Sequence, residues 1–308
     1  MTLTLPTPVC YQCGSSQLDD LGGVPAGRIF AGKPLTPAWA GGRLFRCANC
    51  LLVFRHPLRD QSDFDEKYRD APSDVWTSGA LRFDQTLVRE QITRLCQQGS
   101  VLDIGCYDGA LLRGLGGNYC KFGIEPSEAA AKVASRAGVE IVGESASALA
   151  SLDRQFDVIC AVDVIEHVRN PLDFVRQASV KLKPSGILLI STGNADATLW
   201  RLFGGRFWYC SAPEHIAFLS PSWAENAALE LGLTLVEARK FRHHDERQGA
   251  WYRLCYGAKL LLQLAYSLFE KYLVFPFSSR ARARGPRLYL GVPGLFIDHV
   301  LLVFRHRP

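Results

Sequence analysis

Near its middle the chain reads Val101-Leu102-Asp103-Ile104-Gly105-Cys106-Tyr107-Asp108-Gly109, an apolar run that passes into a turn with two glycines. The run predicts a short buried strand, and the apolar residues of the segment 110–115 predict a helix directly after it. This arrangement brings backbone N–H groups at the helix start beside a loop that glycine lets a ligand approach closely. Taken alone, the pattern is a weak indication of a nucleotide site.

The neighbouring segments alternate between apolar strands and helices. Strands are predicted at 119–124, 139–142, 156–162 and 187–191, and helices at 81–95, 128–137, 172–182 and 221–231. Asn170 and Pro171 supply an N-cap and a first helical residue. The alternation predicts an α/β fold with a doubly wound, mostly parallel sheet.

Acidic residues follow several of these strands. Glu125 ends the second strand about twenty residues after the loop, where an acid can accept both ribose hydroxyls of a nucleoside. Glu144 follows the third strand, at a position that suits an adenine or its ribose, and Asp163 ends the fourth. Asp103 either contacts the ligand or caps the loop through backbone N–H groups, and both roles can coexist.

From Val101 to about Val236 the chain resembles a class I S-adenosylmethionine-dependent methyltransferase. The matching motifs are Asp103 to Gly109, Glu125, Phe156-Asp157-Val158-Ile159, Glu166-His167-Val168 with Asn170-Pro171, and Leu182-Lys183-Pro184-Ser185-Gly186. One departure is Tyr107, which stands where many members carry the middle glycine of the loop.

The resemblance implies a Rossmann-like sheet of seven strands in the order three-two-one-four-five-seven-six, with its last two strands at 233–241 and 299–305. It also implies S-adenosyl-L-methionine as cofactor. The cofactor-binding residues are then Asp103, Gly105, Cys106, Tyr107, Gly109, Glu125, Glu144 and Asp163.

Methyl transfer from a sulfonium is an in-line displacement, so positioning supplies much of the catalysis and a base is optional. For a hydroxyl or carbon-acid acceptor, histidine is the usual base. His167 follows the fourth strand, His215 lies in the loop 209–220, and Tyr209 is a third catalytic candidate. A structural hydrogen bond is the alternative role for each histidine. Glu166 and Glu214 are weaker candidates that orient their neighbours.

Four of the ten cysteines form two C-x-x-C pairs, Cys10 with Cys13 and Cys47 with Cys50. Two such turns complete a closed structural zinc site, which predicts a small zinc-ribbon-like module. The 33 residues between the pairs exceed the roughly 12 to 20 of common zinc patterns. Two unrelated reduced pairs or a redox site are the alternatives, but a redox C-x-x-C needs a βαβ context that is absent here.

The length of the chain and the uneven distribution of its charge indicate several structural parts. A chain of 308 residues exceeds most single compact domains, and its net charge of +5 is concentrated at the C-terminal end. We expect a zinc-binding module at 1–58, a helical connector at 59–98, the S-adenosylmethionine-binding core at 99–245, and an amphipathic helical insertion with the final strand at 246–308.

The segment 251–287 combines an apolar helical pattern with Arg280, Arg282, Arg284 and Arg287. Its longest charge-free stretch, Leu260 to Phe269, is shorter than the roughly 17 residues that a membrane span needs. The helix can lie on an anionic membrane or hold a lipid-linked substrate, but we favour a dimer interface or a lid packed on the core. Since the N-terminus does not resemble a signal peptide, we expect a cytoplasmic protein, peripheral at the inner face of the membrane if the helix binds lipid.

The sequence thus predicts methyl transfer to a small-molecule, sugar or glycan-precursor acceptor, at oxygen, nitrogen or carbon. Sugar methyltransferases are a loose match through the cysteine module and Glu214-His215-Ile216. An RNA-modifying methyltransferase or a zinc-ribbon nucleic-acid binding protein is the alternative. We disfavour it because the cysteine module is not basic and no Asn-Pro-Pro-Tyr-like motif follows the fourth strand. A nicotinamide-dependent dehydrogenase is disfavoured by the lack of a third loop glycine.

Overall fold

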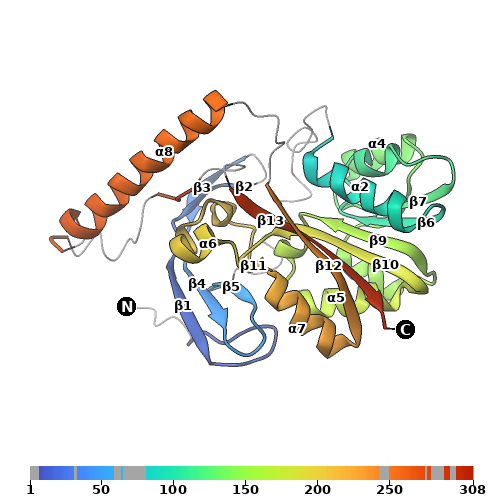
Figure 1. The fold of residues 1–308 in the computed structure, drawn as a ribbon, viewed down its shortest axis with the longest axis horizontal. Coiled ribbons are helices and arrows are strands. Elements are labelled where there is room, and N and C mark those ends of the chain that lie inside the picture. The colour runs from blue at the N-terminus through green and yellow to red at the C-terminus, as the bar shows by residue number, and fades with distance from the viewer. Residues whose placement is uncertain are drawn as a thin grey trace.

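The computed structural model describes residues 7–30, 33–58, 64, 81–242, 250–274, 276–278, 288–291 and 296–307. Its largest element is a seven-stranded sheet in the order β12-β13-β10-β9-β6-β7-β8 (Figure 1). The strands are β6 (Gly99–Ile104), β7 (Tyr119–Ile124), β8 (Glu140–Gly143), β9 (Phe156–Val162), β10 (Leu182–Gly193), β12 (Leu233–Arg242) and β13 (Ile297–His306). β13 runs antiparallel to both of its neighbours, and β6 to β10 pair in parallel.

This sheet confirms the strand order that the resemblance implied. Read as first to seventh strand along the chain, the observed order is three-two-one-four-five-seven-six. The two last strands fall where they were predicted, and the fifth strand, β10, is longer than the predicted 187–191 at both ends.

Helices cover both faces of the sheet because alternate residues of its inner strands are apolar on both sides. Val101, Val158 and Ile187 pack in a cluster with α2, whereas Leu102 and Ile159 pack in another with α5 and α7. Two-sided burial of this kind is typical of parallel strands between helices. The helices are α2 (Phe83–Leu95), α3 (Ala110–Arg113), α4 (Glu128–Arg136), α5 (Pro171–Val180) and α7 (Pro221–Leu231).

Side-chain caps fix the starts of three of these helices. Ser127 accepts from the N–H of Ala130, Asn170 from Asp173, and Ser220 from Trp223. In α5 and α7 a proline follows the cap, where its missing N–H costs nothing. The cap predicted at Asn170 is thereby confirmed.

The N-terminal segment forms a second, antiparallel sheet in the order β1-β4-β5-β11. Its last strand, β11, comes from the loop after β10 and pairs with β5, so the sheet of the cysteine module is completed by a strand from the larger domain. A separate hairpin joins β2 to β3. The bounds are β1 (Leu18–Gly23), β2 (Gly27–Phe30), β3 (Lys33–Trp39), β4 (Arg43–Cys47), β5 (Val53–His56) and β11 (Ala217–Phe218).

Two insertions flank β11 and β13. The first, after β10, holds α6 (Thr198–Phe203) and the short turns η3 (Gly204–Arg206) and η4 (Trp208–Ser211). The second, between β12 and β13, holds α8 (Ala250–Phe269) and η5 (Glu270–Val274), and α8 extends to the upper left of the sheet in Figure 1. Further short turns are η1 (Ala146–Ser151) and η2 (Ile165–His167). Among the described residues, no helix combines the length and hydropathy that crossing a membrane requires.

Candidate active site

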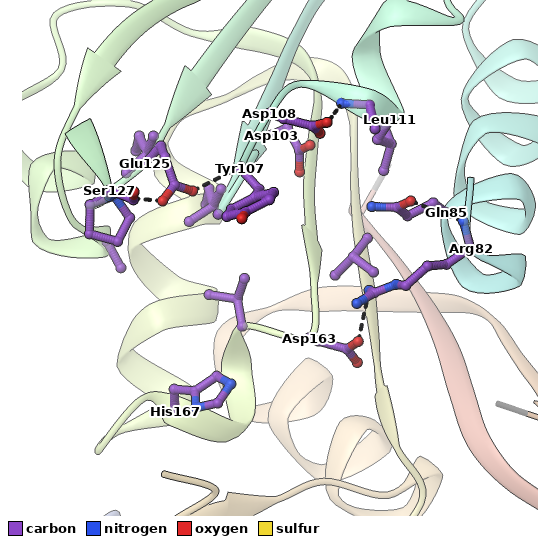
Figure 2. Close-up of a pocket in the computed structure, with 18 of the residues that line it drawn as sticks. Arg82, Gln85, Asp103, Tyr107, Asp108, Leu111, Glu125, Ser127, Asp163 and His167 are labelled. Atoms are coloured by element: carbon purple, nitrogen blue, oxygen red, sulfur yellow. Dashed lines mark hydrogen bonds and ion pairs between the residues drawn. The ribbon is translucent and has the colours of Figure 1, made fainter. Parts of the chain in front are cut away.

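A cavity of about 1150 Å³ opens at the carboxyl ends of β6, β7 and β9. It exceeds the 300–1,000 Å³ typical of small-molecule sites, so a cofactor and an acceptor can fit together. Ligands bind at this edge in open α/β sheets. In Figure 2, Asp103 and Glu125 lie at one end of the pocket and His167 at the other.

The loop after β6 shapes one end of the cavity. Gly105 has φ +73°, its N–H donates to the carbonyl of Ile124 at 2.8 Å, and a Cβ there would come within 2.7 Å of Val164. Tyr107 has φ +48°, a left-handed conformation that costs about 1–2 kcal/mol for a residue with a Cβ. The loop therefore keeps a glycine-like backbone at the position where the sequence departs from the family, and the ring of Tyr107 lines the cavity.

Glu125, at the end of β7, is 5% exposed and holds this loop. Its two carboxylate oxygens accept from the backbone N–H of Tyr107 at 2.8 Å and of Ser127 at 2.9 Å (Figure 2). Burial raises the pKa of Glu125, and the two N–H donors act in the opposite direction. Each oxygen keeps a second lone pair for a ligand hydroxyl, so the residue fits a ribose.

The other predicted cofactor residues divide into two groups. Asp103, Glu144 and Asp163 line the cavity, and burial raises the pKa of Asp103 to about 7. Cys106 and Gly109 do not line it: Cys106 is buried in the apolar cluster beneath the loop, and Gly109, at φ +75°, begins α3. These two residues shape the loop from behind.

Asp163 forms an ion pair with Arg82, which sequence analysis did not identify as a candidate site residue. Its Oδ2 lies 2.8 Å from Nη2 of Arg82, and the same guanidinium binds the buried Asp84 at 2.8 Å. The backbone of Asp163 has φ +52°, an uncommon conformation of the kind that clusters at functional sites. Arg82 precedes the first residue of α2, and no pattern around it indicates a ligand, so only the folded structure identifies it.

At the other end of the cavity, a buried carboxyl group is surrounded by hydroxyls. Glu166 is fully buried, the hydroxyl of Tyr209 donates to its Oε1, and Thr192 donates to its Oε2 at 2.9 Å. Burial, followed by the charge of Asp163, raises the pKa of Glu166 to about 8. From sequence we expected only an orienting role for Glu166, because its pairing with Tyr209 joins residues 43 positions apart.

The two predicted histidines meet beside this carboxyl group. Their rings lie 4.9 Å apart in a T-shaped contact, and the ring of Tyr209 lies 4.4 Å from that of His215. Nδ1 of His167 lies 3.2 Å from the carbonyl of Glu214, and Nδ1 of His215 lies 2.9 Å from that of Tyr209. Burial lowers the pKa of His167 to about 4 and that of His215 well below its usual value, so both imidazoles are neutral at pH 7.

All three catalytic candidates, His167, His215 and Tyr209, therefore line the same cavity as the cofactor candidates. Trp208 lines it too and donates through Nε1 to Asp298 at 3.0 Å. A tryptophan of this kind, inside an aromatic-rich segment, gives no sequence pattern that separates it from a core residue.

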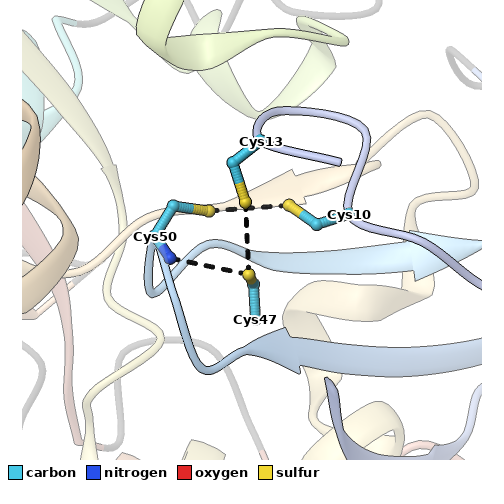
Figure 3. Close-up of side chains that lie close together, drawn as sticks. All are labelled: Cys10, Cys13, Cys47 and Cys50. Atoms are coloured by element: carbon cyan, nitrogen blue, oxygen red, sulfur yellow. Dashed lines mark hydrogen bonds between the residues drawn. The ribbon is translucent and has the colours of Figure 1, made fainter. Parts of the chain in front are cut away.

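The four cysteines of the N-terminal module converge on one point (Figure 3). Their sulfurs lie within 4.8 Å of one another, with 3.5 Å between Cys10 and Cys50 and between Cys13 and Cys47. A tetrahedral zinc with 2.3 Å bonds requires sulfurs about 3.8 Å apart. Despite the long connection between the pairs, the donor set fits a four-thiolate metal site.

A family model described as a methyltransferase domain matches residues 80–238, just over half of the chain. The chain belongs to this methyltransferase family. Residues 80–238 thus form a methyltransferase domain, as the resemblance to this family implied.

Curated relatives of this methyltransferase include ubiquinone biosynthesis O-methyltransferases. That of Azoarcus sp. (strain BH72) is 32% identical over 149 residues, covering 42% of this chain and 64% of that protein. The Caulobacter vibrioides protein is 33% identical over 149 residues, covering 42% and 58%. The methyltransferase thus spans less than two thirds of these two relatives. That of Coxiella burnetii (strain Dugway 5J108-111) is 27% identical over 200 residues, covering 57% and 86%.

Among solved structures, the methyltransferase is similar to magnesium protoporphyrin IX methyltransferase from Synechocystis PCC 6803 with bound SAH. The TM-score is 0.50 at 13% identity, covering 80% of this chain and 100% of that chain. This likeness supports the fold and leaves the acceptor to be argued from the site.

Proposed function

We propose that this methyltransferase transfers the methyl group of S-adenosylmethionine to a hydroxyl of a small acceptor bound between the loop after β6 and the Tyr209–Glu166–His215 cluster. The observation that carries the proposal is the single cavity that joins these two ends. Relatives named O-methyltransferases support an oxygen acceptor. Sugars and glycan precursors remain candidate acceptors beside phenolic ones, because all of them present hydroxyls.

The residues at the cofactor end bind and orient. Glu125 accepts the ribose hydroxyls, and Asp103 supplies negative charge near the cofactor's cationic part. When bound, S-adenosylmethionine supplies an electrophilic methyl carbon whose bond to sulfur breaks as the bond to the acceptor oxygen forms. Holding the hydroxyl in line with that methyl group accounts for much of the rate.

The residues at the acceptor end position and accept the proton of the acceptor hydroxyl. A neutral imidazole, His215 or His167, accepts the hydroxyl proton as the new carbon–oxygen bond forms. Tyr209 donates to Glu166, which fixes its ring against His215. Since burial depresses both histidine pKa values, each is a modest base, and positioning carries the larger share.

To test the proposal, transfer of a labelled methyl group from S-adenosylmethionine is measured with a panel of catechols, phenols and nucleotide-linked sugars. Transfer RNA is offered as the alternative acceptor. If a histidine is the base, His215→Asn or His167→Asn keeps cofactor affinity and loses roughly 100- to 10,000-fold in turnover. His306→Asn, outside the cavity, is the matched control. Methylation of RNA alone would overturn the small-acceptor proposal, and losses below about tenfold in both variants would assign catalysis to positioning.

We also propose that the four cysteines hold one structural zinc ion. The support is the closed, largely buried set of four sulfurs, which leaves no position for a substrate. Elemental analysis of protein purified without chelator tests this, with Cys47→Ser as the variant that loses metal and Cys120→Ser, an exposed lone cysteine, as the control. Less than about 0.2 zinc per chain in the unaltered protein would refute it.

Finally, we propose that α8 contacts an anionic lipid surface, rather than the dimer interface or lid that we favoured from sequence. Leu254, Leu261, Leu262, Leu268 and Phe269 share an exposed face of α8, which supports a partner outside the chain for this face. Glu270 is the only acid between residues 250 and 278, and it is buried against Arg206. Four arginines follow in the segment 280–287, which gives charge complementarity to anionic lipid.

Vesicle flotation separates the candidate occupants of this face. We expect binding to vesicles containing phosphatidylglycerol but not to pure phosphatidylcholine, and its loss in Leu261→Glu/Leu262→Glu. Leu229→Glu on α7, with 69% exposure like Leu261, is the matched control. A concentration-dependent dimer that the double variant breaks, without vesicle binding, would assign the face to a second copy.

A further inference from the structure

The turn that carries Tyr209 and His215 is held from outside by the cysteine module. Arg55 on β5 is 5% exposed, and its guanidinium reaches the backbone of this turn. Nη2 donates to the carbonyls of Cys210 at 2.5 Å and Ala212 at 3.2 Å, and Nη1 donates to that of Pro213 at 3.3 Å. Three carbonyls of one turn thus converge on a single side chain from another sheet.

The backbone on the far side of the turn is attached to the same module. The N–H of Arg55 donates to the carbonyl of Ile216 at 2.9 Å, and the hydroxyl of Tyr11 donates to the same carbonyl at 2.6 Å. Directly beyond it, β11 pairs with β5. Since Tyr11 follows Cys10, the four-cysteine site and the catalytic turn are neighbours in space.

Ile216 also connects these hydrogen bonds to the segment that carries His167. Its N–H donates to the carbonyl of Glu166 at 2.9 Å, and Glu166 precedes His167. Within the turn, the contact between Nδ1 of His215 and the carbonyl of Tyr209 closes the loop around the guanidinium. The carbonyls therefore face Arg55, while the rings of Tyr209 and His215 face the cavity.

A guanidinium suits this position for a geometric reason. Its rigid fork donates in several fixed directions, whereas a lysine ammonium is a single point with a smaller reach. Buried carbonyls that lost these donors would each carry a desolvation cost, so the turn would rearrange. Displacement of a catalytic group by about 1 Å can cost roughly 100-fold in rate.

We infer that Arg55 is a positioning residue of this methyltransferase, through which the N-terminal module sets the placement of Tyr209 and His215 at the acceptor end. The inference rests on the proposed function for the roles of those two side chains, but the geometry that it describes is independent of the acceptor. The cysteine module then supports one wall of the active site from outside, although none of its described residues lines the cavity.

The test compares Arg55→Met, Arg55→Lys and the control Arg43→Met in the full chain. Arg43 lies on β4, is 55% exposed in its side chain and pairs with Asp20 inside the module. The first readout is the NMR titration of the His215 imidazole. In the unaltered protein and the control, burial lowers the pKa of His215 well below its ordinary value, so the imidazole should not titrate near pH 6.5. In Arg55→Met we expect it to titrate near its ordinary pKa of about 6.5. Because the charge of Arg55 itself lowers the pKa of His215, Arg55→Lys, which keeps that charge, is the diagnostic variant, and its His215 should titrate above that of the unaltered protein.

The second readout is hydrogen exchange of the segment 209–218, which should quicken at least tenfold in Arg55→Met. Calorimetry with S-adenosylhomocysteine should give an affinity within about twofold of the unaltered protein, because the loop after β6 and Glu125 do not contact Arg55. This combination separates the inference from the proposed function, since neither readout needs an acceptor. Unchanged His215 titration and unchanged exchange in Arg55→Met would overturn it.

If Arg55→Met does not fold, Tyr11→Phe serves as the second variant for the hydrogen-exchange test. It removes one of the two hydrogen bonds to the carbonyl of Ile216, the one from the Tyr11 hydroxyl, and leaves the ring packed against Phe54, whose centroid lies 4.8 Å away. We expect exchange of residues 214–218 to quicken about threefold or more while zinc content and cofactor affinity hold. Exchange equal to that of the unaltered protein would overturn the inference.

Discussion

Replacing Glu125 by glutamine gives a direct measure of how this methyltransferase holds its cofactor. The side chain keeps its size, so the buried site at the end of β7 stays filled. The amide presents one oxygen and one NH2 group, whereas the carboxylate presents two oxygens to the N–H groups of Tyr107 and Ser127. One backbone donor then faces another donor, and the ribose loses its charged acceptor.

The magnitude follows from the number of charged hydrogen bonds lost. A hydrogen bond to an ionised group contributes about 1.5–3 kcal/mol, so losing the charged acceptance of a ribose hydroxyl should raise the Kd about 10- to 150-fold. Because the variant also disturbs the backbone of Tyr107, we expect the increase in Kd to lie toward the upper end of this range. Isothermal titration with S-adenosylmethionine at pH 7.5 measures the change directly.

Glu128→Gln is the matched control, because Glu128 lies on α4 near the same strand, pairs with Lys132 and does not line the cavity. Its Kd should stay within twofold. An unchanged Kd in Glu125→Gln, with the melting temperature also unchanged, would refute the assignment of the ribose site.

Three further predictions concern pH and backbone strain. Because the pKa of Glu166 is raised to about 8, its contribution to folding is complete below its unfolded pKa of about 4.3 and is lost progressively until the pH has risen through 8; urea unfolding should show Glu166→Gln losing less stability than the unaltered protein between pH 5 and 8. Asp103 has a pKa of about 7, and a cationic cofactor favours its ionised form, so affinity should fall by up to about tenfold per pH unit below 7, a slope that Asp103→Asn should abolish in calorimetry. Tyr107→Gly should be more stable than Tyr107→Ala by about 1 kcal/mol in thermal unfolding, since only glycine adopts φ +48° without cost; equal stabilities would contradict the strain.

Local sequence signals predicted much of this fold because its sheet is built from consecutive strand–helix units. The bounds of β7 and β9 and the start of α5 follow from apolar runs and from the Asn170 cap. The loop from Asp103 to Gly109 and Glu125 likewise lie within one unit, so their meeting at one end of the cavity could be predicted from sequence.

The contacts behind Asp163 and the acceptor end could not be predicted, because they join distant segments, although His167, His215 and Tyr209 themselves were predicted as candidates. Arg82 meets Asp163 across 81 positions, and Arg55 meets the turn at Cys210 across 155. Each of these residues is ordinary in its own neighbourhood. The role of Arg55 arises only when β11 brings the loop after β10 onto the edge of the N-terminal sheet.

The pairing of β5 with β11 also determines how long β5 lacks its partner strand during translation. About 160 residues separate the two strands, so at 5–20 residues per second the ribosome delivers Ala217 and Phe218 roughly 10–30 s after β5 has emerged. During that interval the edge of β5 presents unpaired backbone groups, which are a template for aggregation. Early metal capture by the four cysteines, all translated before β5, would hold that edge in shape until its partner arrives.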